Sequence, residues 1–225
     1  MPQGRPAEVV VFDVNETLSD MSPMAQRFAD VGADPGLAQT WFAALLRDGF
    51  GLAAAGANEK FATLAQEGLR VLFAGADLDR ATDTAIHHVM DGFGSLDVHP
   101  DVVDGVRRLA ESGLRLVTLT NGAAAVADGL LHRAGVREAF EQLLTVEDAA
   151  LWKPAAAPYE YAARQCRVDV GAMLLVAVHP WDIDGAARVG LQTAWVNRTG
   201  GTYPAYYNTP DRTVTGIDDL AMQLT

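Results

Sequence analysis

The chain contains a single cysteine among its 225 residues, which excludes an internal disulfide. Cys166 lies in a helical pattern with no motif around it, so a packed thiol is a better interpretation than a catalytic one. Positive charge is also scarce: 17 Lys and Arg face 29 Asp and Glu, and the net charge of -12 argues against nucleic-acid and membrane-surface partners. The sequence has no run of roughly 18 apolar residues and its start carries no apolar signal core, so we expect a reducing, cytoplasmic setting.

A short apolar run near the start of the chain predicts a buried parallel strand. Three valines lead into Phe12 over residues 9–12, and polar residues follow at once. In an open α/β sheet, ligands bind outside the carboxyl ends of the strands, so Asp13 would direct its carboxylate into that crevice. Two interpretations stay open at this point, a catalytic Asp13 and an Asp13 that only caps the next helix.

After the first strand, the spacing of the apolar residues is first helical over a long stretch and then alternates between strand and helix patterns. Residues 19–95 show helical spacing throughout, which indicates a helical cap over the crevice, although an ordinary helical subdomain would give the same pattern. Strand patterns alternating with helical ones follow over 114–119, 143–146, 173–178 and 192–196. We therefore predict an α/β fold with a doubly wound parallel sheet, formed by residues 1–18 and 96–225, with 19–95 inserted as the cap.

Polar side chains follow four of the predicted strands. They are Asp13 to Thr17, Thr120–Asn121, Lys153 and His179 to Asp182. Each group alone fits a helix cap or a loop, but the strand ends of one parallel sheet converge on one crevice. Lys153 is the most informative, because an amine beside two carboxylates offsets their repulsion and favours the ionised form of each.

The segments FDVNETL, LTNG, WKP and HPWDIDGA, in this order and spacing, resemble the haloacid dehalogenase superfamily. The resemblance extends over nearly the whole chain, from Val9 to about Val196. It implies a Rossmann-like core, a helical cap after the first strand and an aspartate nucleophile. The matching positions are Asp13 for the nucleophile, Thr17, Thr120, Lys153 and Asp182.

Two positions distinguish the branches of this superfamily. Its magnesium phosphatases need an acid two residues after the nucleophile and another that begins the fourth motif. Here these positions hold Asn15, which cannot donate a carboxylic proton, and Val178, which cannot ligate a hard cation. The sequence is more similar to the metal-free L-2-haloacid dehalogenases in LTNGA, in KPAAAPY, in its Trp-Asp pair and in WVNR. This resemblance implies that neither a metal nor another cofactor is required.

The mechanism that the resemblance implies begins with attack of Asp13 on carbon, which displaces halide and leaves an ester. Water then hydrolyses that ester with help from Asp182 and Lys153, while Thr17, Thr120 and backbone N–H groups hold the developing charge. The residues expected to face substrate are Asn15, Phe42, Thr120, Asn121, Tyr159, His179 and Trp181. Without the resemblance, Asn121 fits a turn residue and Trp181 a core aromatic.

Three departures from that branch alter the expected site. Asn15–Glu16 replaces a Tyr-Gly pair, and Ala177 and His179 replace a serine and an asparagine. His179 could hydrogen-bond the water, act as an auxiliary base, cap the following helix or fill space. An arginine that binds substrate on the first long cap helix becomes Phe42, so either another cation replaces it or the substrate is not a typical 2-haloacid.

The sequence thus predicts a hydrolase that cleaves carbon–halogen bonds of small 2-haloacids without a metal. The oligomeric state stays open, with a homodimer, which is common in this branch, as one possibility. Two alternatives remain at this stage. One is a phosphatase of the same fold with degenerate acids, and the other is a non-catalytic binding protein on the same scaffold.

Overall fold

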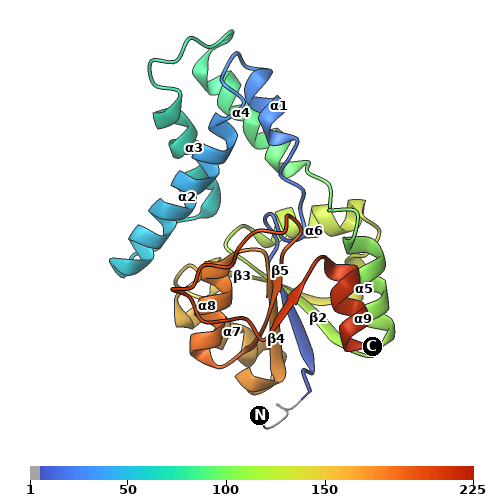
Figure 1. The fold of residues 1–225 in the computed structure, drawn as a ribbon. Helices are drawn as coiled ribbons and strands as arrows, with labels where there is room; N and C mark the ends of the chain where they lie inside the picture. The colour runs from blue at the N-terminus through green and yellow to red at the C-terminus, as the bar shows by residue number, and fades with distance from the viewer. Residues whose placement is uncertain (1–5) are drawn as a thin grey trace.

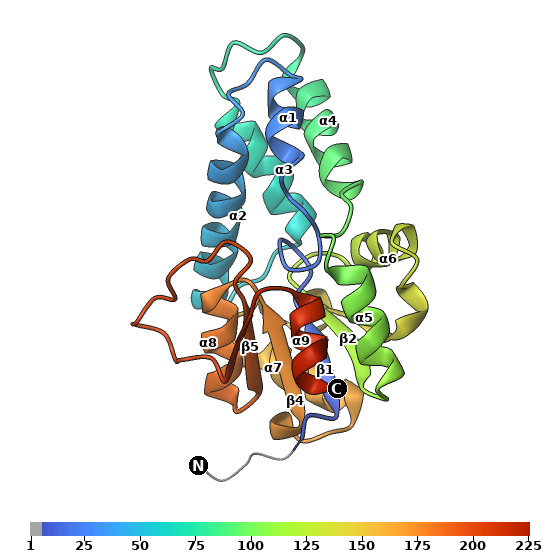
Figure 2. The ribbon, with the colours of Figure 1, turned by 45° about the vertical axis from the view of Figure 1, so that its right-hand side comes forward.

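The computed structural model describes residues 6–225, which form one parallel sheet flanked by helices, with a further group of helices above one end (Figures 1 and 2). The first five residues of the predicted core lie outside the described part. The sheet has the strand order β3-β2-β1-β4-β5-β6, and every pairing is parallel, which confirms the predicted α/β fold. Its strands are β1 (Val9–Phe12), β2 (Arg115–Thr120), β3 (Phe140–Thr145), β4 (Met173–Ala177), β5 (Gln192–Val196) and β6 (Arg212–Val214).

Strand β1 lies in the middle of the sheet and is buried on both faces. Val10 and Phe12 pack into the apolar layer under α5, α6 and α9, whereas Val9 and Val11 pack into the layer under α7 and α8. The bounds of these helices are α5 (Val102–Glu111), α6 (Ala124–Arg133), α7 (Ala156–Cys166), α8 (Pro180–Val189) and α9 (Ile217–Leu224). This double burial explains why β1 is uniformly apolar rather than alternating.

The strand register decides where the polar residues meet. Phe12 pairs with Thr118 of β2 on one side and with Val176 of β4 on the other. Asp13, the next residue, therefore lies beside the carboxyl ends of both neighbouring strands. The residues that follow β2 and β4 come to the same edge, as the sequence predicted.

Four helices between β1 and α5 pack around an apolar cluster of their own, above the carboxyl ends of the strands (Figure 2). They are α1 (Met24–Ala29), α2 (Leu37–Ala54), α3 (Phe61–Leu72) and α4 (Thr82–Gly94). Helix α2 extends over 18 residues, and its second half is rich in glycine and alanine. Within the described residues, no helix has the length and apolar character needed to cross a bilayer.

Trp152 joins the sheet layer to these helices. It belongs to the loop between β3 and α7, yet its ring is buried in the cluster of α1–α4 and stacks on Phe61 with centroids 5.8 Å apart. Its indole N–H donates to the carbonyl of Glu59 at 2.9 Å. A Cβ built on Gly49 of α2 would lie 2.4 Å from a Trp152 carbon. A glycine is therefore required at this contact.

We expect Gly49→Ala to lower the free energy of unfolding by about 1–3 kcal/mol, because the added methyl group must displace the Trp152 ring. Gly51, on the same helix, is the matched control, since a Cβ there would meet nothing within 4 Å. Gly51→Ala should raise stability by up to about 1 kcal/mol through helix propensity. Urea unfolding of both variants measures the difference, and equal stability would contradict the contact.

Candidate active site

Asp13 lies at the tip of β1, and three donors converge on its buried carboxylate. Oδ1 accepts from Nζ of Lys153 at 2.9 Å, and Oδ2 accepts from Oγ1 of Thr17 at 2.7 Å and pairs with Nδ1 of His179 at 3.0 Å. Burial opposes ionisation, but the charges of Lys153 and His179 outweigh it and hold the pKa of Asp13 well below its usual range. Asp13 is thus an anion held by side chains, and it makes none of the contacts of a helix cap.

Lys153 connects two carboxylates from different strands. Its side chain has no solvent exposure, and Nζ donates to Oδ2 of Asp182 at 2.6 Å as well as to Asp13. Burial disfavours the charged amine, yet the two carboxylates raise the pKa of Lys153 above its ordinary value. The juxtaposition expected from the sequence, one amine between two acids, is present in the structure.

Asp182, at the start of α8, is completely buried. Its Oδ1 accepts from the hydroxyl of Tyr159 at 2.6 Å, while Oδ2 is held by Lys153. Burial raises the pKa of Asp182 in spite of the neighbouring ammonium. A carboxylate with a raised pKa is a better proton acceptor than an ordinary one.

Two residues expected to face substrate hold the charged residues instead. Tyr159 has no exposed surface, and its hydroxyl is bonded to Asp182. The amide of Asn121 accepts from the main-chain N–H of Lys153 at 3.0 Å and donates to its carbonyl at 3.4 Å, so it fixes the backbone of the lysine. Neither contact is visible in a local sequence pattern.

Thr17 and Thr120 act within the loops that follow their strands. The hydroxyl of Thr17 donates to Asp13 and accepts from the N–H of Val178 at 3.1 Å, which links the end of β1 to that of β4. The hydroxyl of Thr120 accepts from the N–H of Gly122 at 2.9 Å. Thr120 also lines a small apolar cavity of about 90 Å³ together with Asn15.

His179 lies between two acids. Its Nδ1 meets Asp13, and its Nε2 lies 2.8 Å from Oε2 of Glu16. Burial lowers the pKa of the ring, but the hydrogen bonds and charges of the two carboxylates raise it to about 9. His179 has a carboxylate at each ring nitrogen, an arrangement that favours its protonated form. It stands at the N-cap position of α8, yet its side chain makes no capping hydrogen bond.

Glu16 is the residue of this site that sequence reasoning missed. It was noted only as a departure from the related branch, whereas its partner His179 was expected to face substrate. The signal was their joint occurrence, an acid and a potential cation in place of two neutral residues at neighbouring strand ends.

Aromatic contacts connect this cluster to the helices above it. The Trp181 ring stacks on His179 with centroids 4.8 Å apart, and meets Phe50 of α2 edge to face at 4.9 Å. Phe42, also on α2, is buried against Trp41 and lines a cavity of about 300 Å³ that Glu16 also lines. Phe42 is thus both a packing residue and part of the wall of a cavity next to the site.

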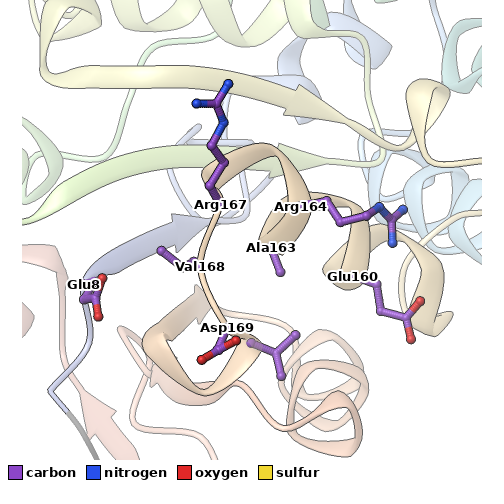
Figure 3. A pocket seen from close by; sticks show the side chains of 8 residues that line it. Glu8, Glu160, Ala163, Arg164, Arg167, Val168 and Asp169 are labelled. Atoms are coloured by element: carbon purple, nitrogen blue, oxygen red, sulfur yellow. The ribbon is translucent and has the colours of Figure 1, made fainter.

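A larger hollow, of about 670 Å³, lies away from these residues, beside the start of β1 and the end of α7 (Figure 3). The charged groups of Arg164 and Arg167 point apart rather than toward one point in this hollow (Figure 3). None of the site residues expected from the sequence lines it. The titratable side chains that converge on one point lie instead at the carboxyl end of the sheet.

The donor set around Asp13 does not fit a divalent cation. Both oxygens of Asp13 are already engaged by Lys153, Thr17 and His179, and the neighbouring positions hold Asn15 and Val178. Over residues 6–225, no group of three or more His, Cys, Asp or Glu side chains is arranged to hold a metal ion.

The ionisation of His179 predicts how stability depends on pH. Because its pKa rises from 6.5 to about 9 on folding, its contribution is complete below pH 6.5 and is lost as pH rises toward 9. The loss should amount to roughly 3 kcal/mol in the wild-type chain and should be absent from His179→Gln. Urea unfolding at pH 6.5 and pH 9 tests this, and an equal loss in both proteins would contradict it.

Comparisons with known proteins identify the family to which this chain is similar. Residues 7–190 match the family model described as haloacid dehalogenase-like hydrolase. An (S)-2-haloacid dehalogenase of Pseudomonas sp. (strain YL) is 35% identical over 64% of this chain, and the match spans 60% of that protein's length. (S)-2-Haloacid dehalogenase H-109 of Pseudomonas putida is 28% identical over 96% of this chain and 97% of its own length. The crystal structure of an L-2-haloacid dehalogenase, 27% identical, superposes with a TM-score of 0.89 over 98% of this chain and 99% of that one.

Proposed function

The chain belongs to the haloacid dehalogenase-like hydrolases, and from this premise we propose that it hydrolyses the carbon–halogen bond of small 2-haloacids without a metal ion. The observation that carries the proposal is the buried amine of Lys153 bonded at once to Asp13 and Asp182. The ammonium group keeps the carboxylate of Asp13 ionised, as a nucleophile requires, and it holds the carboxylate of Asp182 next to it. The relatives named (S)-2-haloacid dehalogenase support the same chemistry.

In the first step, a carboxylate oxygen of Asp13 attacks the carbon that bears the halogen. The new C–O bond forms as the carbon–halogen bond breaks, and the halide leaves with the bonding electron pair. A halide needs no proton to depart, which is consistent with the neutral amide of Asn15 two residues after the nucleophile. The product of this step is an ester on the side chain of Asp13.

In the second step, water attacks the side-chain carbonyl carbon of Asp13. Asp182 accepts the proton of that water, and Lys153 and Thr17 stabilise the negative oxygen of the tetrahedral intermediate. As the intermediate collapses, the ester C–O bond breaks and the leaving oxygen takes the proton held by Asp182, which releases a 2-hydroxy acid. The carboxyl group of Asp13 then loses the second proton of the water and is a carboxylate again. One water is consumed, and one halide and one proton are released.

We also propose that residues 19–95 act as a cap that shields this reaction from bulk solvent while the one water of the second step is admitted. The contact between Phe50 and Trp181 and the insertion of Trp152 support this role, because both join α1–α4 to the site end of the sheet. Excluding water strengthens the electrostatic interactions that hold Asp13 and Lys153.

Halide release from chloroacetate, bromoacetate and both 2-chloropropionates, measured in EDTA, tests the proposal. We expect turnover that the chelator does not reduce, and no hydrolysis of an aryl phosphate when magnesium is added. Magnesium-dependent phosphate release without halide release would overturn the proposal.

A further inference from the structure

The carboxylate of Asp13 is held unequally at its two oxygens. Oδ1 accepts a hydrogen bond from Nζ of Lys153 at 2.9 Å. Oδ2 accepts from Oγ1 of Thr17 at 2.7 Å and lies 3.0 Å from Nδ1 of His179. A carboxylate oxygen offers two lone pairs, so the hydrogen bonds made by residues 6–225 occupy both on Oδ2 and leave one on Oδ1. Attack on carbon needs a free lone pair, which Oδ1 therefore provides.

The ring of His179 donates from both nitrogens. Its Nδ1 lies on Oδ2 of Asp13, and its Nε2 lies 2.8 Å from Oε2 of Glu16. Ionised carboxylates accept hydrogen bonds and do not donate them, so each contact places a proton on the nitrogen. The Trp181 ring stacks on His179 with centroids 4.8 Å apart and holds the imidazole in its plane. His179 is thereby a charged donor directed at one oxygen of the nucleophile.

The two oxygens of Asp13 have different fates after the first step. Attack by Oδ1 turns it into the ester oxygen and leaves Oδ2 as the carbonyl oxygen of the ester. When water adds to the side-chain carbonyl carbon, the negative charge of the tetrahedral intermediate forms on Oδ2. Donors that stabilise such an oxyanion lie about 2.7–3.1 Å from it. Thr17 and His179 already lie within this range of Oδ2 in the resting site.

Glu16 matters because the ester removes a charge from the site. Once Asp13 is esterified, Oδ2 belongs to a neutral carbonyl and no longer favours the protonated ring of His179. The carboxylate of Glu16 stays in contact with Nε2 and continues to favour it. The charged donor is therefore kept for the step in which the oxyanion forms.

Resting on the function proposed above, we propose that Oδ1 of Asp13 attacks the substrate and that His179, together with Thr17, stabilises the oxyanion that forms on Oδ2. His179 donates a hydrogen bond and keeps its proton, so the proton balance of the two steps is unchanged. Lys153 acts on the same charge from the neighbouring oxygen. Glu16 is a positioning residue, because it acts through the ring of His179 and touches no reacting atom.

His179→Leu tests the charged donor, with chloroacetate as substrate and rapid quenching to follow halide and 2-hydroxy acid separately. We expect a burst of halide as fast as in the wild type, because attack by Oδ1 does not use His179. Hydrolysis of the ester should slow by about 10²–10³-fold, the cost of one oxyanion donor. The ester should therefore accumulate on Asp13 as an added mass in the intact protein. Wild-type turnover with no added mass would overturn the proposal.

Glu16→Gln is the milder variant, because the Glu16 side chain is 41% exposed. Glutamine can still accept from Nε2 of His179 but carries no charge, so ester hydrolysis should slow by about tenfold and the ester should again accumulate. Asp20→Asn is the matched control, because Asp20 lines the same cavity of about 420 Å³ but bonds to Ser22. An equal slowing in Asp20→Asn would reduce the effect to general charge and overturn the role of Glu16.

A crystal structure of the ester trapped in either variant shows which oxygen attacked. We expect the ester oxygen beside Lys153 and the carbonyl oxygen beside Thr17, and the reverse arrangement would overturn the assignment of Oδ1. Halide release by the wild type without ester accumulation in His179→Leu or Glu16→Gln means that dehalogenation stands and this inference fails. Absence of halide release by the wild type from every haloacid removes the proposed function, and this inference with it.

Discussion

Replacing Asp13 by Asn will reduce halide release to the uncatalysed background, a loss of at least about 10⁴-fold. The amide cannot form the ester, because its oxygen carries no full negative charge and is a poor nucleophile. The amide has the same shape as the carboxylate, and its single oxygen still accepts one of the two hydrogen bonds that Lys153 and Thr17 donate. Halide release and circular dichroism together separate loss of chemistry from loss of fold.

The matched control for this prediction is Asp48→Asn. Asp48 lies on the exposed surface of α2, where its carboxylate is paired with Arg47. This variant should keep the wild-type rate. Substantial halide release by Asp13→Asn would exclude the ester mechanism, whatever the control shows.

Replacing Lys153 by Met will both inactivate and destabilise the protein. Methionine has a similar length but no charge, so the carboxylates of Asp13 and Asp182 are left buried without their shared cation. Removing one partner of a buried ion pair costs about 3–5 kcal/mol, and we expect a loss of unfolding free energy in this range at neutral pH. Halide release should fall to background, because the developing oxyanion loses its stabilising ammonium.

The pH dependence of this loss identifies its cause. Without the ammonium, burial raises the folded-state pKa values of the two aspartates, so protonation at lower pH relieves their repulsion. The deficit relative to wild type should therefore shrink as pH falls from about 7 to about 5. Lys60, the other lysine of the chain, is exposed, and Lys60→Met should show neither effect. A deficit that stays constant with pH would mean lost packing rather than unpaired charge.

The sequence was sufficient for the parts of the molecule that depend on strand order. Asp13, Thr17, Lys153 and Asp182 converge as expected, because the carboxyl ends of parallel strands share one edge. The family, the α/β fold and the hydrolase class predicted from the motifs are confirmed. The cytoplasmic setting stays a prediction, and the oligomeric state stays open.

Contacts across long separations were not accessible to sequence reasoning. Glu16 and His179 are 163 positions apart in the sequence, and the periodicity of apolar residues cannot predict a contact over such a separation. The roles of Tyr159 and Asn121 depend on which way each side chain turns after its backbone is placed. The position of Trp152 among the helices of another layer follows from packing alone.

The insertion of Trp152 has a consequence for how the enzyme works. Trp152 and Lys153 are consecutive, so any movement that lifts α2 and α3 away from the sheet must either break the contacts of the indole with Gly49 and Phe61 or shift the backbone of Lys153. Under the proposed cap role, entry of substrate and exit of product would be linked to the position of Lys153, the counter-ion of Asp13. The peptide bond between Trp152 and Lys153 thus joins a residue packed among α1–α4 to the residue that holds Asp13.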